Sequence, residues 1–60
     1  MTVRVVLVDD HEMVIEGLKA MLAPFSGRVE VVGEAVGADK AMAVVLDLQP
    51  DIVLCDVRMQ

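Results

Sequence analysis

The chain has 60 residues, close to the lower limit for independent folding, and 57% of them are hydrophobic although Phe25 is the one aromatic residue. A net charge of −5 opposes direct binding of nucleic-acid phosphates, and the single cysteine, Cys55, excludes an internal disulfide. The sequence contains no run of 18 consecutive apolar residues, so it predicts no membrane-spanning segment. A surplus of aliphatic residues without such a span is typical of part of a larger core, so we expect an N-terminal fragment of a longer protein. Met1 leads directly into a strand pattern without a basic signal region, which favours a cytoplasmic location.

The first predicted element is a strand over residues 3–8, a β-branched run with one charge near its start. Such a run is typical of a central strand that is buried on both faces. Asp9 and Asp10 follow it at once. Two adjacent like charges at this place either begin a helix, with Asp10 or His11 as its N-cap, or form part of a site.

A helix is predicted over residues 12–23, where apolar residues recur at helical spacing. Its buried face is expected to contain Val14, Leu18, Met21 and Leu22. Glu16 and Lys19 have the i, i+3 spacing of an ion pair, and Pro24 should end the helix. Three methionines, Met13, Met21 and Met42, are expected to fill gaps between the helices and the sheet.

Two more strands and a second helix follow. Residues 29–34 form a more polar strand that is expected nearer an edge, and a turn at 36–37 leads into a helix over residues 38–48. The apolar residues of this helix are Ala41, Met42, Val45 and Leu48. After Gln49 and Pro50, residues 51–56 form the third strand, in which Cys55 is expected to be a small buried residue.

The alternation of strands and helices predicts an α/β fold with a parallel sheet. Two strand orders remain open, because order 1-2-3 would put both helices on one face and order 2-1-3 would put them on opposite faces. The first strand is the most apolar, which favours a central position and the order 2-1-3. In that order the chain turns in opposite directions after strands 1 and 3, and open α/β sheets carry their sites at such a point.

Three aspartates would converge there: Asp9 and Asp10 at the end of the first strand, and Asp56 at the end of the third. Neighbouring carboxylates disfavour each other's ionisation, and a bound Mg²⁺ would relieve this repulsion. The same ion would neutralise charge on an incoming phosphoryl group, which one aspartate could accept as an acyl phosphate. The sequence therefore predicts a magnesium-dependent phosphoryl site.

Three stretches, "VLVDDHEMVIEGL", "VVGEA" and "PDIVLCDVRM", resemble the first half of a bacterial response-regulator receiver domain. The resemblance covers the whole chain, residues 1–60, and implies a truncated flavodoxin-like (CheY-like) β-α-β-α-β fold. The stretch DDH with Gly17 and Leu18 six and seven residues later is similar to the LuxR/NarL-type subgroup, whose members carry a helix-turn-helix output domain.

The resemblance also implies a role for each site residue. Asp56 matches the phosphoacceptor, Asp9 and Asp10 match the acidic pair that binds Mg²⁺, and Arg58 matches the residue whose backbone carbonyl completes the metal shell. Of the acidic pair, Asp10 is expected to be the direct ligand. The partner would be a sensor histidine kinase, and DNA would be bound only through an output domain outside these residues. The chain would be a signalling phosphoacceptor and not an enzyme acting on other substrates.

Several other interpretations stay open at this point. The chain could belong to a Mg²⁺-dependent phosphohydrolase with an aspartate nucleophile, although such enzymes typically carry D-x-D where this chain has "VDDHE". It could also be a pseudo-receiver that serves only as an interaction surface. In the simplest case Asp10 is only a helix cap, Asp56 only a turn residue, and His11 a residue at the rim. The open edge of the third strand predicts self-association of the fragment.

Overall fold

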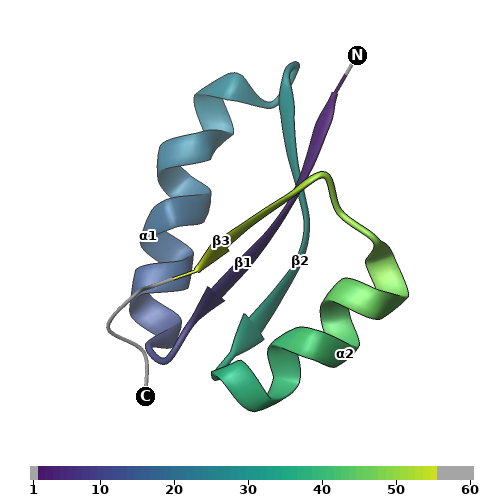
Figure 1. The fold of residues 1–60 in the computed structure, drawn as a ribbon. Helices are drawn as coiled ribbons and strands as arrows, with labels where there is room; N and C mark the ends of the chain where they lie inside the picture. Colours follow the sequence, from purple (N-terminus) through teal and green to yellow (C-terminus); the bar gives the residue numbers. More distant parts are fainter. Residues whose placement is uncertain (1, 56–60) are drawn as a thin grey trace.

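The computed structural model describes residues 2–55, in which strands and α-helices alternate (Figure 1). The strands are β1 (Val3–Asp9), β2 (Val29–Val36) and β3 (Ile52–Cys55). The helices are α1 (Glu12–Leu22), a short 3-10 turn η1 (Ala23–Phe25) and α2 (Ala38–Leu48).

The three strands form one parallel sheet in the order β2-β1-β3. This confirms the predicted 2-1-3 order and excludes 1-2-3. The central strand is also the most buried element, because Val5, Val6, Leu7 and Val8 are at most 3% exposed. A β-branched run is stable in this position because neighbouring strands satisfy both of its edges and helices cover both of its faces.

Successive residues of β1 point to opposite faces and build two separate cores. Val5 and Leu7 pack with Ile15 of α1, whereas Val6 and Val8 pack with Ala35 and with the apolar residues of α2. The two helices therefore cover opposite faces of the sheet, as predicted, and Figure 1 shows α1 and α2 on either side of it.

The predicted buried face of α1 was wrong in part. Ile15 is fully buried, and Leu18 and Leu22 pack beside it, whereas Val14 is 44% exposed and Met21 is 70% exposed. Residues 15, 18 and 22 lie on one face of a helix with 3.6 residues per turn. The buried face of α1 therefore contains Ile15 in place of the predicted Val14.

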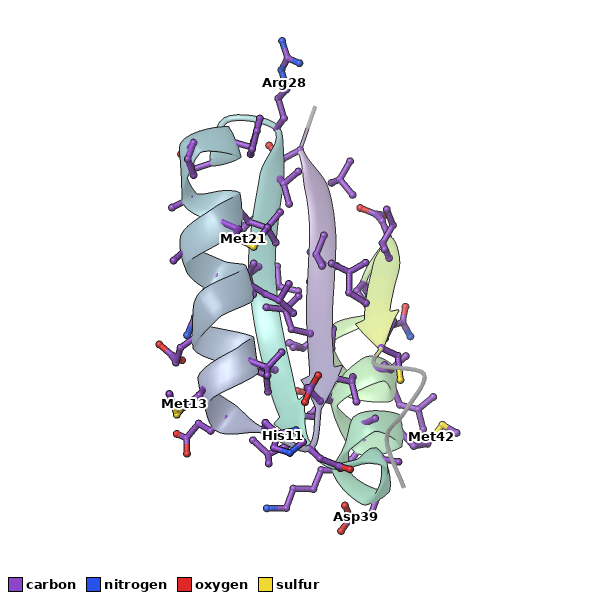
Figure 2. The ribbon with its side chains drawn as sticks, turned by 90° about the vertical axis from the view of Figure 1, so that its left-hand side faces the viewer. His11, Met13, Met21, Arg28, Asp39 and Met42 are labelled. Carbon is purple, nitrogen blue, oxygen red and sulfur yellow. The ribbon has the colours of Figure 1, made fainter. Side chains whose placement is uncertain are left out.

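The methionines do not fill the helix–sheet interfaces. Met13 is 87% exposed, Met21 70% and Met42 66%, and in Figure 2 Met13 and Met42 point away from the sheet. Smaller β-branched and aliphatic residues fill those interfaces instead. On α2 the packed residues are Ala41, Val44, Val45 and Leu48, so Val44 takes the place that was expected for Met42.

Close packing of α2 on β2 depends on Gly33. A Cβ atom at this position would collide with Cδ1 of Leu48 and would touch Cγ1 of Val44 at 3.4 Å. The pairing of β1 with β2 also shifts its register between Val5 and Val6, where Val6 pairs with Gly33. The glycine thus marks a bulge and a close helix approach, two common uses of glycine in a strand.

The element boundaries differ slightly from the expected ones. The α-helix ends at Leu22, and the 3-10 turn then carries the chain through Pro24. Strand β2 continues two residues past the predicted end, to Val36, because it stays paired with β1 as far as Asp9. The second helix has the predicted bounds, and the described part of β3 begins at Ile52.

Lys19 links α1 to the sheet. Its Nζ lies 3.3 Å from Oε2 of Glu16, the predicted i, i+3 partner, and 3.2 Å from Oε2 of Glu34 on β2. Hydrogen bonds to these two carboxylates, that to Glu34 first, raise the pKa of Lys19 above its ordinary value. The ammonium of Lys19 therefore stays charged throughout the neutral range.

Strand β3 is an edge strand in the described part of the chain. Ile52, Val53 and Leu54 are 46%, 41% and 40% exposed, and Cys55 is exposed as well. The expectation of a buried Cys55 was therefore wrong. The physical reason is that β3 pairs with β1 along one edge, and no described element covers its other edge.

No helix in residues 2–55 combines the length and the apolar character needed to cross a bilayer.

Candidate functional site

The candidate site lies at the edge of the sheet where the parallel strands end. Asp9 is the last residue of β1 and pairs with Val36, the last residue of β2. On the other side of β1, Val8 pairs with Cys55, the last described residue of β3. A pocket at this edge is lined by Asp9 together with Val8, Leu18, Leu54 and Cys55, so the ends of β1 and β3 meet there beside α1.

Asp9 is a buried acid, with 3% of its surface exposed. Burying a carboxylate is costly unless hydrogen bonds replace the lost water. His11 supplies such bonds: its backbone N–H donates to Oδ1 of Asp9 at 2.9 Å, and its Nδ1 lies 3.2 Å from the same oxygen. His11 is also the N-cap of α1 and has extended backbone angles. The aspartate is therefore held in place by the residue that starts the helix.

Asp10 is exposed between β1 and α1, although the cap position itself belongs to His11. Gly37 lies near Asp10 across the edge, since a Cβ added to that glycine would lie 4.0 Å from Oδ1 of Asp10. The same Cβ would lie 2.8 Å from Oδ1 of Asp39. Figure 2 shows Asp39 and His11 at the same end of the molecule. A further carboxylate, which the sequence did not single out, therefore stands at this edge.

Gly37 joins β2 to α2 with backbone angles of φ 99° and ψ 148°. Its N–H donates to the backbone carbonyl of Asp9 at 2.9 Å, so the turn after β2 is tied to the end of β1. The sequence predicted only a turn at this place. A glycine between a strand and a helix at the carboxyl edge of a sheet was the signal that could have identified it as part of the site's frame.

Replacing Gly37 by alanine should lower the free energy of unfolding by about 1–3 kcal/mol, because this backbone region is open almost only to glycine. The new Cβ would also press on Oδ1 of Asp39. Urea unfolding of the full-length protein measures the effect. The matched control is Gly27→Ala, where a Cβ meets nothing within 4 Å. That variant should be as stable as the parent or gain up to about 1 kcal/mol, and an equal loss in both variants would contradict the assignment.

The described residues supply part of the predicted metal site. Asp9 and Asp10 bring carboxylate oxygens, the hard donors that Mg²⁺ takes, to one strand end. Within residues 2–55, no three acidic, histidine or cysteine side chains gather closely enough to hold a metal ion. The other predicted ligands, Asp56 and the backbone carbonyl of Arg58, lie outside the described residues. The carboxylate oxygens of the acidic pair thus fit Mg²⁺. Asp9 and Asp10 are the predicted metal-site residues that lie within the described part of the chain.

Comparison with known proteins places the chain in a family. The family model described as "Response regulator receiver domain" matches residues 5–60. The response regulator protein VraR of Staphylococcus aureus (strain Mu3 / ATCC 700698) is 43% identical over 60 residues, which is 100% of this chain and 28% of the relative. The response regulator GacA of Pseudomonas viridiflava is 42% identical over 57 residues, covering 95% of this chain and 26% of the relative.

The chain spans about a quarter of the length of these curated relatives. No solved structure matches it significantly. The family match covers nearly the whole sequence and agrees with the parallel 2-1-3 sheet, the helices on both faces and the acidic residues at the end of β1. The chain belongs to the response regulator receiver domain family.

Proposed function

We propose that this chain is the receiver portion of a two-component response regulator in which Asp56 accepts a phosphoryl group from a sensor histidine kinase. The register of the sheet is the observation that supports this proposal. Val8 and Cys55 are paired across β1 and β3, and the next residues in sequence are Asp9 and Asp56. Two strands that end in register bring their following residues to one edge, where a phosphoryl group can meet several carboxylates.

The proposed reaction is a transfer between two nucleophiles. A carboxylate oxygen of Asp56 forms a bond to phosphorus while the bond from phosphorus to the donor's histidine nitrogen breaks, and that nitrogen keeps the electron pair. The product is an acyl phosphate. Mg²⁺, when held directly by Asp10, Asp56 and the backbone carbonyl of Arg58, with the Asp9 carboxyl group behind Asp10, would offset the negative charge of the phosphoryl oxygens.

Asp9 and Asp10 have different proposed roles in the site. Asp9 is buried and its Oδ1 accepts a hydrogen bond from the backbone N–H of His11, so its carboxyl group keeps a defined position at the strand end. Asp10 is exposed and lies across from the Gly37 turn, where it can reach an ion in solvent. This division supports Asp10 as the direct ligand of the acidic pair and Asp9 as a fixed carboxylate behind it.

The wider setting is part of the same proposal. The chain would act in the cytoplasm as a signalling phosphoacceptor and not as an enzyme with other substrates. Its phosphorylation would control a DNA-binding, LuxR/NarL-type output domain located after these residues, and so regulate transcription. The response regulators VraR and GacA, each about four times as long as the matched segment, are consistent with a further domain of this kind.

The direct test is phosphorylation of the full-length protein by acetyl phosphate in the presence of Mg²⁺. Intact-mass spectrometry should show a labile increment of one phosphoryl group. Asp56→Asn should abolish the increment, because an amide is not a nucleophile of this kind. Asp47→Asn is the matched control, since it makes the same chemical change at an exposed position of α2 and should leave the increment unchanged.

The same experiment separates the alternative functions. Persistence of the increment in Asp56→Asn would refute the assignment of the acceptor. Turnover of an added phosphate ester by the full-length protein would favour a phosphohydrolase. The absence of both the increment and Mg²⁺ binding would favour a pseudo-receiver.

A further inference from the structure

Strand β2 contains one extra residue at the point where its pairing with β1 shifts. Val31 lies opposite Val5, but the next pair joins Gly33 to Val6, so Val32 is the extra residue of a β-bulge. A bulge of this kind interrupts the regular alternation of side chains between the two faces of a sheet. Each residue of β2 after the bulge therefore faces the side opposite to the one that a regular strand would give it.

The contacts of β2 follow this reversal. Before the bulge, Val31 packs with the core under α1. Val32 packs with the core under α2, and Gly33 faces the same helix, because a Cβ added to it would collide with α2. After the bulge, Glu34 lies on the α1 side, where its Oε2 is 3.2 Å from Nζ of Lys19. Two consecutive residues thus face α2, and the second fits there because it is a glycine.

A regular pairing without the bulge would place a charge in the core. In that register Val32 would lie opposite Val6, and Glu34 would lie opposite Val8, a residue of the apolar core under α2. The Glu34 carboxylate would then lose its ion pair with Lys19 and enter the core, and burying an unpaired charge is costly. The charge of Glu34 therefore favours the bulged register.

The register also decides which backbone group stands beside the acidic pair. In the bulged register Val36 lies opposite Asp9, and the backbone N–H of Gly37 donates to the carbonyl of Asp9 at 2.9 Å. In the regular register Ala35 would lie opposite Asp9, and the N–H of Gly37 would stand one residue too far along to make this bond. The bulge therefore places the turn that is tied to the main chain of the acidic pair.

We infer that Gly33 is a positioning residue for the acidic pair: it admits the bulge, and the bulge brings the N–H of Gly37 to the carbonyl of Asp9. This inference rests on the proposed function, because it concerns the carboxylates that are proposed to serve a Mg²⁺ site. Loss of a group that orients the ligands of a metal typically lowers its affinity roughly 10- to 100-fold. A displaced Gly37 should therefore weaken Mg²⁺ binding although every ligand is still present.

The test compares Gly33→Ala with the double variant Gly33→Ala/Leu48→Val in the full-length protein. The added Cβ would collide with Cδ1 of Leu48 and destabilise the bulged register, whereas Leu48→Val removes that atom and leaves room for the Cβ. Isothermal titration should show about a tenfold loss of Mg²⁺ affinity in Gly33→Ala and nearly the parent affinity in the double variant. The matched control is Gly17→Ala on α1, where a Cβ meets nothing within 4 Å, and it should bind Mg²⁺ as the parent does.

Amide hydrogen exchange without Mg²⁺ measures the bond between Gly37 and Asp9 itself. In Gly33→Ala the Gly37 amide should exchange about tenfold faster, while the amides in the middle of α1 keep their protection. The double variant with Leu48→Val should restore slow exchange at Gly37. A loss of stability alone would accelerate both sets of amides.

Glu34→Gln tests the register without a new contact at Gly33, and it serves should Gly33→Ala fail to fold. It removes the charge that opposes the regular register, so the Gly37 amide should exchange about threefold faster. Glu30→Gln is the matched control on the same strand. Residues 29–31 have the same partners on β1 in both registers, so this change should leave the exchange of Gly37 unaltered.

Unchanged exchange at the Gly37 amide in Gly33→Ala and Glu34→Gln would overturn the inference, and so would equal acceleration in the middle of α1. Faster exchange at Gly37 with unchanged Mg²⁺ affinity would also count against it, because the bulge would then place the turn but not the acidic pair. A parent protein that binds no Mg²⁺ would instead refute the proposed metal site, and the exchange of Gly37 would still decide whether the bulge places the turn.

Discussion

Asp10→Ala should lose detectable Mg²⁺ binding and should be phosphorylated about 100-fold more slowly than the parent protein, the usual size of effect when one electrostatic group of a reaction site is removed. Asp10 is the exposed member of the acidic pair, and it lies across from the turn at Gly37. Isothermal titration with Mg²⁺ measures the first effect, and mass spectrometry after addition of acetyl phosphate measures the second. Both use the full-length protein.

Loss of function in Asp10→Ala should not come with loss of stability. Asp9 and Asp10 carry like charges on adjacent residues, and removing one charge relieves their repulsion. Without Mg²⁺, the variant should therefore unfold at the same urea concentration as the parent or at a higher one. A large drop in stability would show that Asp10 has a structural role that the acidic pair alone does not explain.

Asp39→Ala is the control that separates a specific ligand from general negative charge. Its carboxylate stands at the same edge, beside Gly37, but follows a different strand. We expect Asp39→Ala to bind Mg²⁺ and accept a phosphoryl group nearly as well as the parent. An equal loss in the two variants would contradict the role proposed for Asp10.

The strand order could be predicted because it depends on a coarse property of the chain. The run Val5–Val8 is apolar at every position, and only a strand flanked on both edges and covered on both faces can bury it. Once β1 is central, right-handed crossovers put the two helices on opposite faces. The place of Asp9 and Asp10 at the carboxyl edge then follows directly from their position in the sequence.

The details that failed depend on fine geometry that a pattern does not encode. Val14 and Ile15 are adjacent and similar in size, and a rotation of α1 by one position decides which of them is buried. The exposure of Cys55 depends on what lies along the far edge of β3, which the apolar character of the strand does not reveal.

The hydrogen bonds that hold Asp9 in the site were the hardest feature to predict from the sequence. The bond from Gly37 to Asp9 and the contact of His11 with Asp9 join residues through backbone atoms, and backbone geometry leaves little trace in residue type. The hydrogen bonds between Arg4 and Asp51 were missed for the same reason: the backbone N–H of Arg4 donates to Oδ2 of Asp51, and the backbone N–H of Asp51 donates to the carbonyl of Arg4. Asp51 directly precedes Ile52, the first residue of β3 that pairs with β1, and its side chain accepts a hydrogen bond from the backbone N–H of Arg4.

Ile15→Ala should lower the free energy of unfolding by about 2–5 kcal/mol, because Ile15 is fully buried against Val5 and Leu7 and its removal leaves a cavity. Ile15→Val, which removes one methylene group, should cost about 0.5–1.5 kcal/mol. The matched control on the same helix is Met21→Ala. Met21 is 70% exposed, so this change should alter stability by no more than about 0.5 kcal/mol. Urea unfolding of the full-length protein measures all three.

The comparison of Ile15 with Met21 tests which face of α1 supports the site. Ile15 packs under Leu7, two residues before Asp9, and α1 starts at the residue that holds the Asp9 carboxylate. A cavity at Ile15 should therefore loosen the acidic corner as well as the core, and Mg²⁺ affinity should fall in Ile15→Ala while it stays constant in Met21→Ala. If Met21→Ala were the more damaging change, the packing described for α1 would be wrong, and with it the argument that the helix start fixes Asp9.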